Sequence, residues 1–277
     1  MNRRATLIAL YLVLLTYAVL ALMPFVWMLI TSFKEQRDLF RLPPSFYPKL
    51  LFSDQPFENY KSVWEKRDFH LYFRNSLIVS FLSAVGQVFT CSLAGYAFAK
   101  FEFQGKNFLY AMVLSTAFVP AEVTVIPEFL VMRWIGWTDT WLPLIVPSFL
   151  VGAFGTFMLR EYFSALPDEY REAAIIDGAN PFRVFFHIYL PQAVPALVAI
   201  FVIAFINNWD EFLRPLIFLN SEKLYTVPLG LMRFVSQYEA SWHQLMAGSV
   251  ISILPLALVY MITQRYVLQG FMNGGVK

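Results

Sequence analysis

Several otherwise apolar stretches of this sequence are interrupted by acidic and amide side chains. Glu122 and Glu128 lie within one stretch, and another ends in the run Asn207-Asn208-Trp209-Asp210-Glu211. Carboxylates and amides hydrogen-bond to hydroxyl-rich solutes, and ionisable groups inside an apolar span usually mark a solute path. We therefore expect a polar solute path, whose candidate residues are Glu122, Asn207, Asn208, Trp209 and Asp210.

Helix start and stop signals mark the long polar stretch that follows residue 160. Pro167 suits the first position of a helix, and the two acidic residues after it would place negative charge at the helix N-terminus. Gly178 can adopt the left-handed conformation that ends a helix. Asn180 would then cap a second helix that begins at Pro181 and ends before Pro191. The sequence thus predicts two short helices joined at Gly178.

The same stretch offers an apolar surface. Ala173 and Ala174 are small enough to let another surface approach closely, whereas Phe182, Phe185 and Phe186 carry large apolar areas. Such areas are costly to leave in water. We therefore expect the pair of helices to dock on another protein surface through an aromatic face.

Motifs for catalysis and metal binding are absent from the sequence. The three histidines do not form HExxH, GxSxG does not occur, and Cys91 is the only cysteine. These facts exclude an internal disulfide and a multi-cysteine metal site, and they leave an intramembrane protease without its usual motifs. No phosphate-binding GxxxxGK[ST] loop is present. We therefore expect no enzyme activity and no cofactor on this chain.

The composition indicates an integral membrane protein. Hydrophobic residues make up 58% of the 277 residues and charged residues only 14%, against roughly 25% charged residues in soluble domains. Even a large soluble core leaves a charged surface, and a bilayer removes the need for one. The net charge of +2, without a basic run or an acidic tail, argues against nucleic acid as a partner.

Apolar runs predict an all-α polytopic membrane protein with a single domain over residues 1–277. A spanning helix needs about 20 apolar residues, and no strand-period alternation is long enough for a barrel. The six expected spans cover approximately residues 7–30, 76–99, 108–132, 141–160, 193–211 and 245–264. Pro120 and Pro127 predict a break or bend in the outer half of the third span.

Two features near the membrane surface leave alternatives open. Apolar residues from Phe57 to Trp64 recur at helical spacing within a polar segment, which fits either an interfacial helix or a helix covering the mouth of the bundle. The acids of the expected path could instead all lie at the outer interface, where water removes their cost. Trp209 would then be an interface anchor.

Charge alone does not fix the orientation. The expected inner segments hold nine lysines and arginines and the outer segments the remaining twelve of 21, eight of them at residues 34–74. The positive-inside rule is weak for a loop of that length. Arg3-Arg4, without an acid nearby, favours an inner N-terminus.

The spacing of residues 172–191 resembles a known family. Glu172-Ala173-Ala174, three residues, Gly178, nine residues and Ile188-x-Leu190-Pro191 is similar to the EAA loop of ABC-importer permeases. From average residue frequencies, a chance match occurs at roughly one start position in 10⁸. Other segments across nearly the whole chain are similar to the maltose-type carbohydrate permeases: Asn75-Ser76-Leu77, Asn208 to Phe212 with Pro215, Tyr225 to Gly230, and Gly270 to Lys277.

This resemblance implies a cytoplasmic coupling loop over residues 164–191 that docks on an ATPase dimer, which binds ATP and Mg. It also implies a second related permease chain, an external solute-binding protein, and lipid around the spans. The chain is then expected in the cytoplasmic (inner) membrane with both termini in the cytoplasm. It would couple closure of the ATPase to alternating access for a carbohydrate or sugar-like solute. The docking residues that the resemblance assigns are Glu172, Ala173, Ala174, Asp177, Gly178, Asn180, Pro181, Phe182, Leu190 and Pro191.

Two other functions stay open. The same machinery could import glycerol phosphate or another osmolyte, although a phosphate ester would favour a basic cluster, and Arg133 and Arg214 are too few to make one. A membrane channel or membrane enzyme would need a symmetric filter sequence or a paired acid and base within the spans. The sequence shows neither.

Overall fold

The computed structural model describes residues 3–41, 46–66, 68–235 and 240–275. Helices account for most of these residues, and no strand occurs among them. The contacts divide the chain into two compact units, residues 1–70 with 230–254 and residues 71–229 with 255–277. The all-α fold that the sequence predicted is therefore confirmed.

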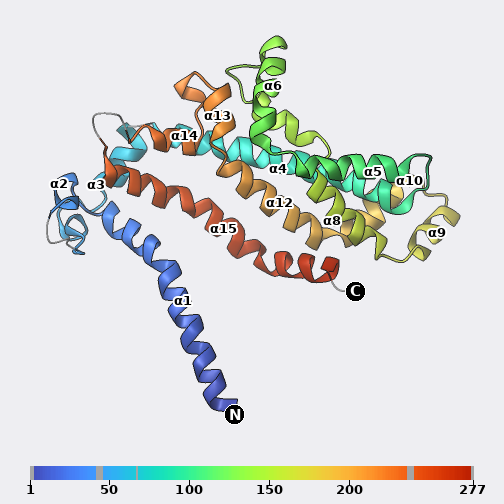
Figure 1. The fold of residues 1–277 in the computed structure, drawn as a ribbon, viewed down its shortest axis with the longest axis horizontal. Helices are drawn as coiled ribbons and strands as arrows, with labels where there is room; N and C mark the ends of the chain where they lie inside the picture. Colours follow the sequence, from blue (N-terminus) through green and yellow to red (C-terminus); the bar gives the residue numbers. More distant parts are fainter. Residues whose placement is uncertain (1–2, 42–45, 67, 236–239, 276–277) are drawn as a thin grey trace. The chain divides into compact units, whose positions relative to one another are not determined.

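Figure 1 labels most of the α-helices, which are numbered in chain order. The first unit begins with α1 Arg3–Ser32, α2 Gln36–Leu39, the 3₁₀ turn η1 Lys49–Phe52, α3 Glu58–Lys61 and the π-helix η2 Ser62–Lys66. Next come α4 Phe69–Lys100, α5 Lys106–Ser115, η3 Thr116–Phe118, α6 Ala121–Trp134, α7 Leu142–Ile145, η4 Val146–Phe149 and α8 Ala153–Ser164. They are followed by α9 Glu169–Ile176, α10 Pro181–Val184, the π-helix η5 Phe185–Tyr189, α11 Leu190–Gln192 and α12 Val194–Trp209. The last elements are α13 Leu213–Phe218, η6 Glu222–Leu224, α14 Val227–Met232 and α15 Trp242–Gly275.

Four helical segments in the described part of the chain are long and apolar enough to cross a membrane. They are Thr6–Ser32, Phe69–Lys100, Leu142–Ser164 and Trp242–Tyr266. Two bent pairs raise the number to six if each pair counts as one span: Lys106–Phe118 with Ala121–Trp134, and Pro181–Gln192 with Val194–Trp209. The six span boundaries therefore stay a prediction.

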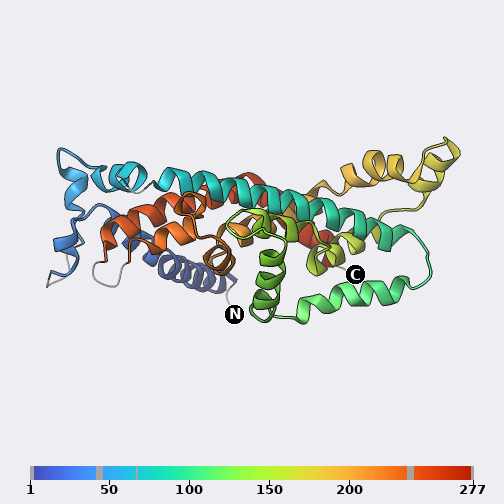
Figure 2. The ribbon, with the colours of Figure 1, turned by 90° about the horizontal axis from the view of Figure 1, so that it is seen from above.

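The break expected in the third span is present. The axes before and after it differ by 103°, and Figure 2 shows α6 turning away from α5. Pro120 stands at the break with an extended backbone, directly before α6. Because proline has no N–H and disfavours a helical residue before it, the chain leaves one helix and starts another here. Pro127, by contrast, lies inside α6.

Within the first unit, the apolar side chains of α1 are exposed along most of the helix. A helix this apolar is stable where lipid or another chain covers it. Asn59 holds the end of α1, because its Nδ2 donates to the carbonyl oxygens of Ser32 (2.7 Å) and Lys34 (2.9 Å). Phe57 and Trp64 remain exposed, so only part of the apolar stripe expected in this segment is buried.

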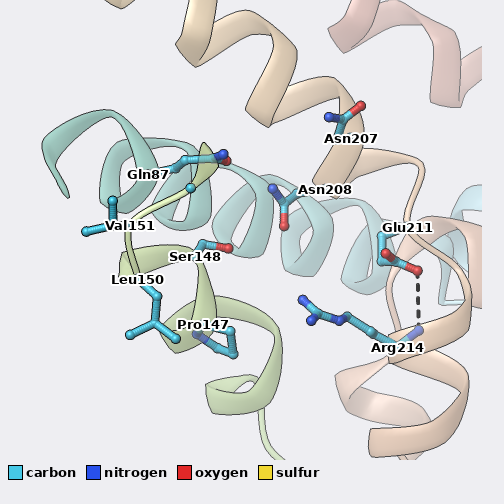
Figure 3. Close-up of a pocket in the computed structure, with 10 residues that line it drawn as sticks. Gln87, Pro147, Ser148, Leu150, Val151, Asn207, Asn208, Glu211 and Arg214 are labelled. Atoms are coloured by element: carbon cyan, nitrogen blue, oxygen red, sulfur yellow. Dashed lines mark hydrogen bonds between the residues drawn. The ribbon is translucent and has the colours of Figure 1, made fainter. Parts of the chain in front are cut away.

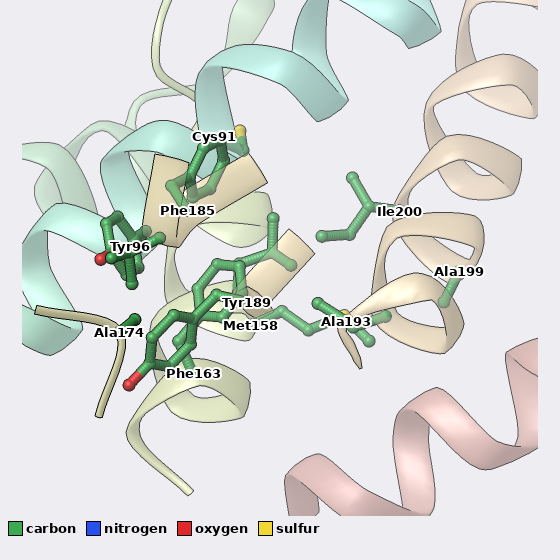
Figure 4. Close-up of a cluster of buried hydrophobic side chains, with 13 residues drawn as sticks. Cys91, Tyr96, Met158, Phe163, Ala174, Phe185, Tyr189, Ala193, Ala199 and Ile200 are labelled. Atoms are coloured by element: carbon green, nitrogen blue, oxygen red, sulfur yellow. The ribbon is translucent and has the colours of Figure 1, made fainter. Parts of the chain in front are cut away.

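In the second unit, a buried cluster forms where α4, α8 and residues 184–200 meet (Figure 4). Glycines bring α4 and α8 close together at this point. A Cβ on Gly95 would lie 2.8 Å from Cβ of Leu159, and one on Gly155 would lie 2.8 Å from Sγ of Cys91. A smaller cluster packs Val79 of α4 against α6, α7 and α13.

Side-chain hydrogen bonds hold the loop 219–225 near the N-terminal end of α4. Asn75 Nδ2 donates to the carbonyl oxygens of Lys223 (2.8 Å) and Tyr225 (2.9 Å), and Trp141 Nε1 donates to that of Leu224 (3.0 Å). Asp139 Oδ1 accepts from the backbone N–H groups of the two residues at 220 and 221. Residues far apart in the sequence therefore fix this loop.

Candidate functional site

The joint at Gly178 has the conformation that the sequence predicted. The φ angle of Gly178 is 82°, and its N–H donates to the carbonyl oxygen of Ile175 while that of Ala179 donates to Ala174 (2.9 Å). These bonds satisfy carbonyl groups at the end of α9. Nothing lies within 4 Å of a Cβ placed on Gly178, so the backbone angle, not lack of space, calls for glycine here. The first helix begins at Glu169, two residues after Pro167. Its first backbone hydrogen bonds run from the N–H groups of Arg171 and Glu172 to the carbonyl oxygen of Asp168.

The second helix starts as expected and continues further than expected. Asn180 Oδ1 accepts from the backbone N–H of Arg183 (2.8 Å), and Pro181 is the first residue of α10. The chain then widens into the π-helix Phe185–Tyr189 and passes through Pro191 without stopping. A wider turn accommodates a proline ring and its missing N–H more easily than a regular α-helical turn does.

One face of this segment packs into its own unit. Val184, Phe185 and Tyr189 are at most 1% exposed, and the rings of Phe185 and Tyr189 each lie 5.1 Å from the ring of Tyr96 in α4. Phe163 of α8 joins the same cluster (Figure 4). The expectation that Phe185 belongs to the docking face was therefore wrong, because a sequence does not show which side of a short helix meets its own bundle.

The other face is open. Ile176 is 86% exposed and Phe182 is 69% exposed. Eight of the ten docking residues assigned above are exposed, Ala174 is buried and Leu190 is half-buried. The two short helices thus keep one face against the bundle and present another, which includes two large apolar side chains, to solvent.

Lys100 ties this segment to α4. Its Nζ donates to the carbonyl oxygen of Leu166 (2.7 Å) and to Oδ1 of Asp168 (2.8 Å), and it lies 5.3 Å from the centre of the Tyr189 ring. The Lys100 side chain is only 4% exposed. The hydrogen bond from Lys100 holds the pKa of Asp168 below its usual value. The last residue of a long helix therefore fixes the start of the two-helix segment.

A polar pocket of about 290 Å³ lies elsewhere in the second unit (Figure 3). Gln87 of α4, Ser148 of η4, Asn208 of α12 and Arg214 of α13 turn toward a shared space. The remaining lining residues are Pro147, Leu150, Val151, Gly152, Asn207 and Glu211. Amide, hydroxyl and guanidinium groups converge here from four helices, and the Glu211 carboxylate lies between α12 and α13. Converging polar groups of this kind orient a polar ligand.

The polar groups of the pocket differ in how they are satisfied. The side chains of Gln87, Ser148 and Asn207 make no hydrogen bond within the described ranges, whereas Asn208 Nδ2 donates to the carbonyl of Ala204 (2.8 Å). Glu211 Oε1 accepts from the backbone N–H groups of the two residues that begin α13. The pocket thus retains unused donors and acceptors. Over the same residues, no group of three or more histidine, cysteine or acidic side chains is placed to hold a metal ion.

The expected path residues do not all meet. Asn207 and Asn208 line the pocket, but Trp209 is 1% exposed and stacks on Phe205 with ring centres 5.8 Å apart. Asp210 and Glu122 are exposed and do not line the pocket. Glu211, one of the acids singled out in the sequence, also lines the pocket. Three further polar lining residues, Gln87, Ser148 and Arg214, were not among the expected path residues. The available signal was Gln87, the one glutamine within residues 76–99.

Comparison with known families decides the class of the protein. Residues 91–272 match the family described as "binding-protein-dependent transport system inner membrane component". The chain belongs to this family. The segment 164–191 and the polar pocket, except Gln87, lie within the matched residues.

Relatives of this inner membrane component are permeases. The chain is 34% identical over 273 residues to a probable ABC transporter permease protein of Bacillus subtilis, YurM, with 97% of this chain and 86% of the relative covered. It is 33% identical to the arabinooligosaccharide transport system permease AraQ of the same organism, with 98% and 95% covered. The chain is thus an ABC transporter permease, a transport subunit and not an enzyme.

The fold of this permease matches a solved transporter. A chain of a bacterial ABC transporter involved in the import of the acidic polysaccharide alginate superposes with a TM-score of 0.82. The match covers 96% of this chain and 98% of that one at 24% sequence identity. At this identity, the similarity establishes the fold alone.

Proposed function

We propose that this permease forms part of the membrane path of a carbohydrate importer and docks on its ATPase through the open face of α9 and α10. The relative AraQ, whose name gives arabinooligosaccharides as its cargo, supports the carbohydrate class. In this proposal a second, related permease completes the path, an ATPase dimer binds ATP and Mg, and an external binding protein delivers the solute.

The observation that carries the docking proposal is the two-sided packing of residues 164–191. Lys100 and the Tyr96 cluster fix the inner face of the segment, while Ile176 and Phe182 stay exposed on the outer face. An apolar side chain held outward on a fixed element is well suited to fill a cleft on a partner. Because its inner face is anchored to α4, movement of the docked segment would pass directly into the bundle.

The docking proposal is tested by adding a charge to the open face. Phe182→Asp should lower retention of the ATPase by tagged permease. Loss of a phenylalanine that the docked ATPase would bury costs about 2 kcal/mol, or about 30-fold in affinity. Phe40→Asp is a matched control, because Phe40 is 70% exposed and Phe182 is 69% exposed, and Phe40 lies in the first unit outside the segment. Equal ATPase retention by the two variants would refute docking through this face.

We further propose that the pocket around Asn208 forms part of the solute path. Its unused amide and hydroxyl groups support this, because hydroxyl-rich solutes need several weak hydrogen bonds at once. Asn208→Ala should reduce uptake from a mixture of labelled oligosaccharides by reconstituted transporter, with assembly and basal ATP hydrolysis unchanged. Val151→Ala, a pocket variant without a polar group, is the control. Unchanged uptake in Asn208→Ala would show that the pocket is not part of the solute path.

The proposed orientation places residues 164–191 and both termini in the cytoplasm. In a Cys91→Ser background, an impermeant thiol reagent applied to intact cells should label Lys223→Cys and leave Asn180→Cys unmodified. Opening the cells should expose Asn180→Cys to the same reagent. Labelling of Asn180→Cys in intact cells would reverse the orientation.

A further inference from the structure

Among the described residues that line the polar pocket, Arg214 is the one cation, and a neighbouring acid already neutralises it. Arg214 Nη2 donates to Oε2 of Glu128 at 2.8 Å, which joins α13 to α6. The Glu128 side chain is 14% exposed and the Arg214 side chain 30% exposed, so water screens this pair only in part. Arg214 is therefore poorly placed to compensate the charge of an incoming anion.

One further carboxylate, that of Glu211, adds a negative charge and forms no ion pair among the described residues. The single charge of Glu128 is matched by Arg214, although the second oxygen of Glu128, Oε1, is buried and has no hydrogen-bond partner within those residues. Glu211 lines the pocket, and the groups bonded to its Oε1 are neutral backbone N–H groups. With Glu128, Glu211 and Arg214 counted together, the formal charge is −1. The other polar lining groups, Gln87, Ser148 and the two asparagines, are neutral.

We infer that this pocket admits neutral hydroxyl-rich solutes and rejects anionic ones such as uronates, sulfonated sugars and phosphate esters. The inference rests on the proposed solute path and adds the charge class of the cargo to it. A carboxylate or phosphate entering the pocket would meet Glu211, with Arg214 held by Glu128. A sugar hydroxyl would instead donate to a carboxylate or amide oxygen and accept from Gln87 or Ser148. Neutral solutes therefore gain hydrogen bonds in a pocket where anions meet repulsion.

Charged thiol reagents test the inference without knowledge of the natural solute. In the assembled transporter, Ser148→Cys in a Cys91→Ser background would react with methanethiosulfonate reagents carrying a trimethylammonium or a sulfonate group. Reaction rates are compared with those of free 2-mercaptoethanol. The ratio of the sulfonate rate to the trimethylammonium rate should be on the order of tenfold lower at Ser148→Cys than for the free thiol. One net negative charge in a partly screened pocket predicts an effect of this size.

Two glutamates of α6 provide the matched pair. Glu128→Gln frees the charge of Arg214 and should raise the relative sulfonate rate on the order of tenfold. Glu122→Gln removes the same charge from the same helix at a residue that is not paired with Arg214, and it should leave the ratio unchanged. A sulfonate rate ratio equal to that of the free thiol, or equal effects of the two variants, would overturn the inference. So would the absence of reaction at both Ser148→Cys and Asn208→Cys, because the pocket would then be closed to solutes.

Failure of the inference is distinguishable from failure of the proposed path. Normal uptake in Asn208→Ala together with the expected charge selectivity would show that the pocket is electronegative but does not form part of the solute path. Reduced uptake in Asn208→Ala without charge selectivity would retain the path and contradict the exclusion of anions.

Discussion

The ammonium group of Lys100 lies 2.8 Å from a carboxylate oxygen of Asp168, at the point where α4 ends and the two-helix segment begins. The two partners differ in burial, since the Lys100 side chain is 4% exposed and that of Asp168 is 62% exposed. The same ammonium group also binds the carbonyl oxygen of Leu166. Lys100 therefore has the larger role in the pair, because it satisfies a backbone group as well as a side chain.

Substitution of either partner should separate these roles. Lys100→Met keeps the length and the apolar stem of the side chain but removes the ammonium group that donates to the carbonyl oxygen of Leu166. A carbonyl group left without a hydrogen bond costs about 1–3 kcal/mol. We expect the segment 164–191 to become more sensitive to limited proteolysis and ATP hydrolysis to respond several-fold less to loaded binding protein. Asp168→Asn should have a smaller effect, because the amide oxygen can still accept a hydrogen bond from Lys100 Nζ. Equal effects of the two variants would show that the ion pair, not the backbone contact, holds the segment.

The hydrogen bonds of Asp139 predict a dependence on pH in the loop 219–225. Its contacts with Ser221 and with the backbone N–H of Asn220 lower the pKa of the Asp139 carboxyl group. A lowered pKa in the folded state stabilises the fold above the unfolded pKa of about 3.9, and this contribution is lost as the pH falls through the folded value. The amides of Asn220 and Ser221 should therefore stay protected from hydrogen exchange at pH 5 and lose protection only below about pH 4.

Two variants control this prediction. Asp139→Asn keeps an oxygen that can accept both backbone bonds and tolerates the positive φ of 57° at this position, so protection should no longer depend on acid pH. Asp139→Ala removes the acceptor and should lose protection at every pH. Protection of the wild-type amides that is unchanged at pH 3 would contradict the role of the carboxylate.

The close approach of α4 and α8 can be tested by a double-mutant cycle. Gly155→Ala would place a Cβ 2.8 Å from Sγ of Cys91, and overpacking of this kind costs about 1–3 kcal/mol. Cys91→Ala removes that sulfur atom, so the double variant should recover part of the lost thermal stability. Additive losses in the double variant would show that the two helices do not meet at these residues.

Local features of the candidate site could be predicted from the sequence, because they depend on neighbouring residues. Gly178 ends a helix through its own backbone angle, and Asn180 caps the next helix three residues before its partner N–H. Pro120 breaks the third span for an equally local reason. In each case the residue type limits the backbone directly.

Features that depend on distant residues could not be predicted in this way. The burial of Phe185 depends on Tyr96 and Phe163, and the pocket brings Gln87 together with residues 60 or more positions later in the chain. Nothing near Arg214 in the sequence indicates that its charge is neutralised by Glu128, 86 residues earlier. Sequence periodicity gives the face of a helix but not the element that covers it.

Transmission of movement through the joint at Gly178 is the central claim, and Gly178→Val tests it most directly. The substitution forces a β-branched residue into a left-handed conformation, at a cost of roughly 1 kcal/mol or more, and should re-aim α10 while the spans stay intact. Gly136→Val is the matched control, since Gly136 has a φ of 75° and equally free space around a Cβ. The measurement is ATP hydrolysis and solute uptake by the complete transporter in liposomes with loaded binding protein. We predict that Gly178→Val assembles but loses at least tenfold in both stimulated hydrolysis and uptake, whereas Gly136→Val retains them. Normal uptake and normally stimulated hydrolysis in Gly178→Val would contradict the claim that this joint transmits movement from the ATPase to the bundle.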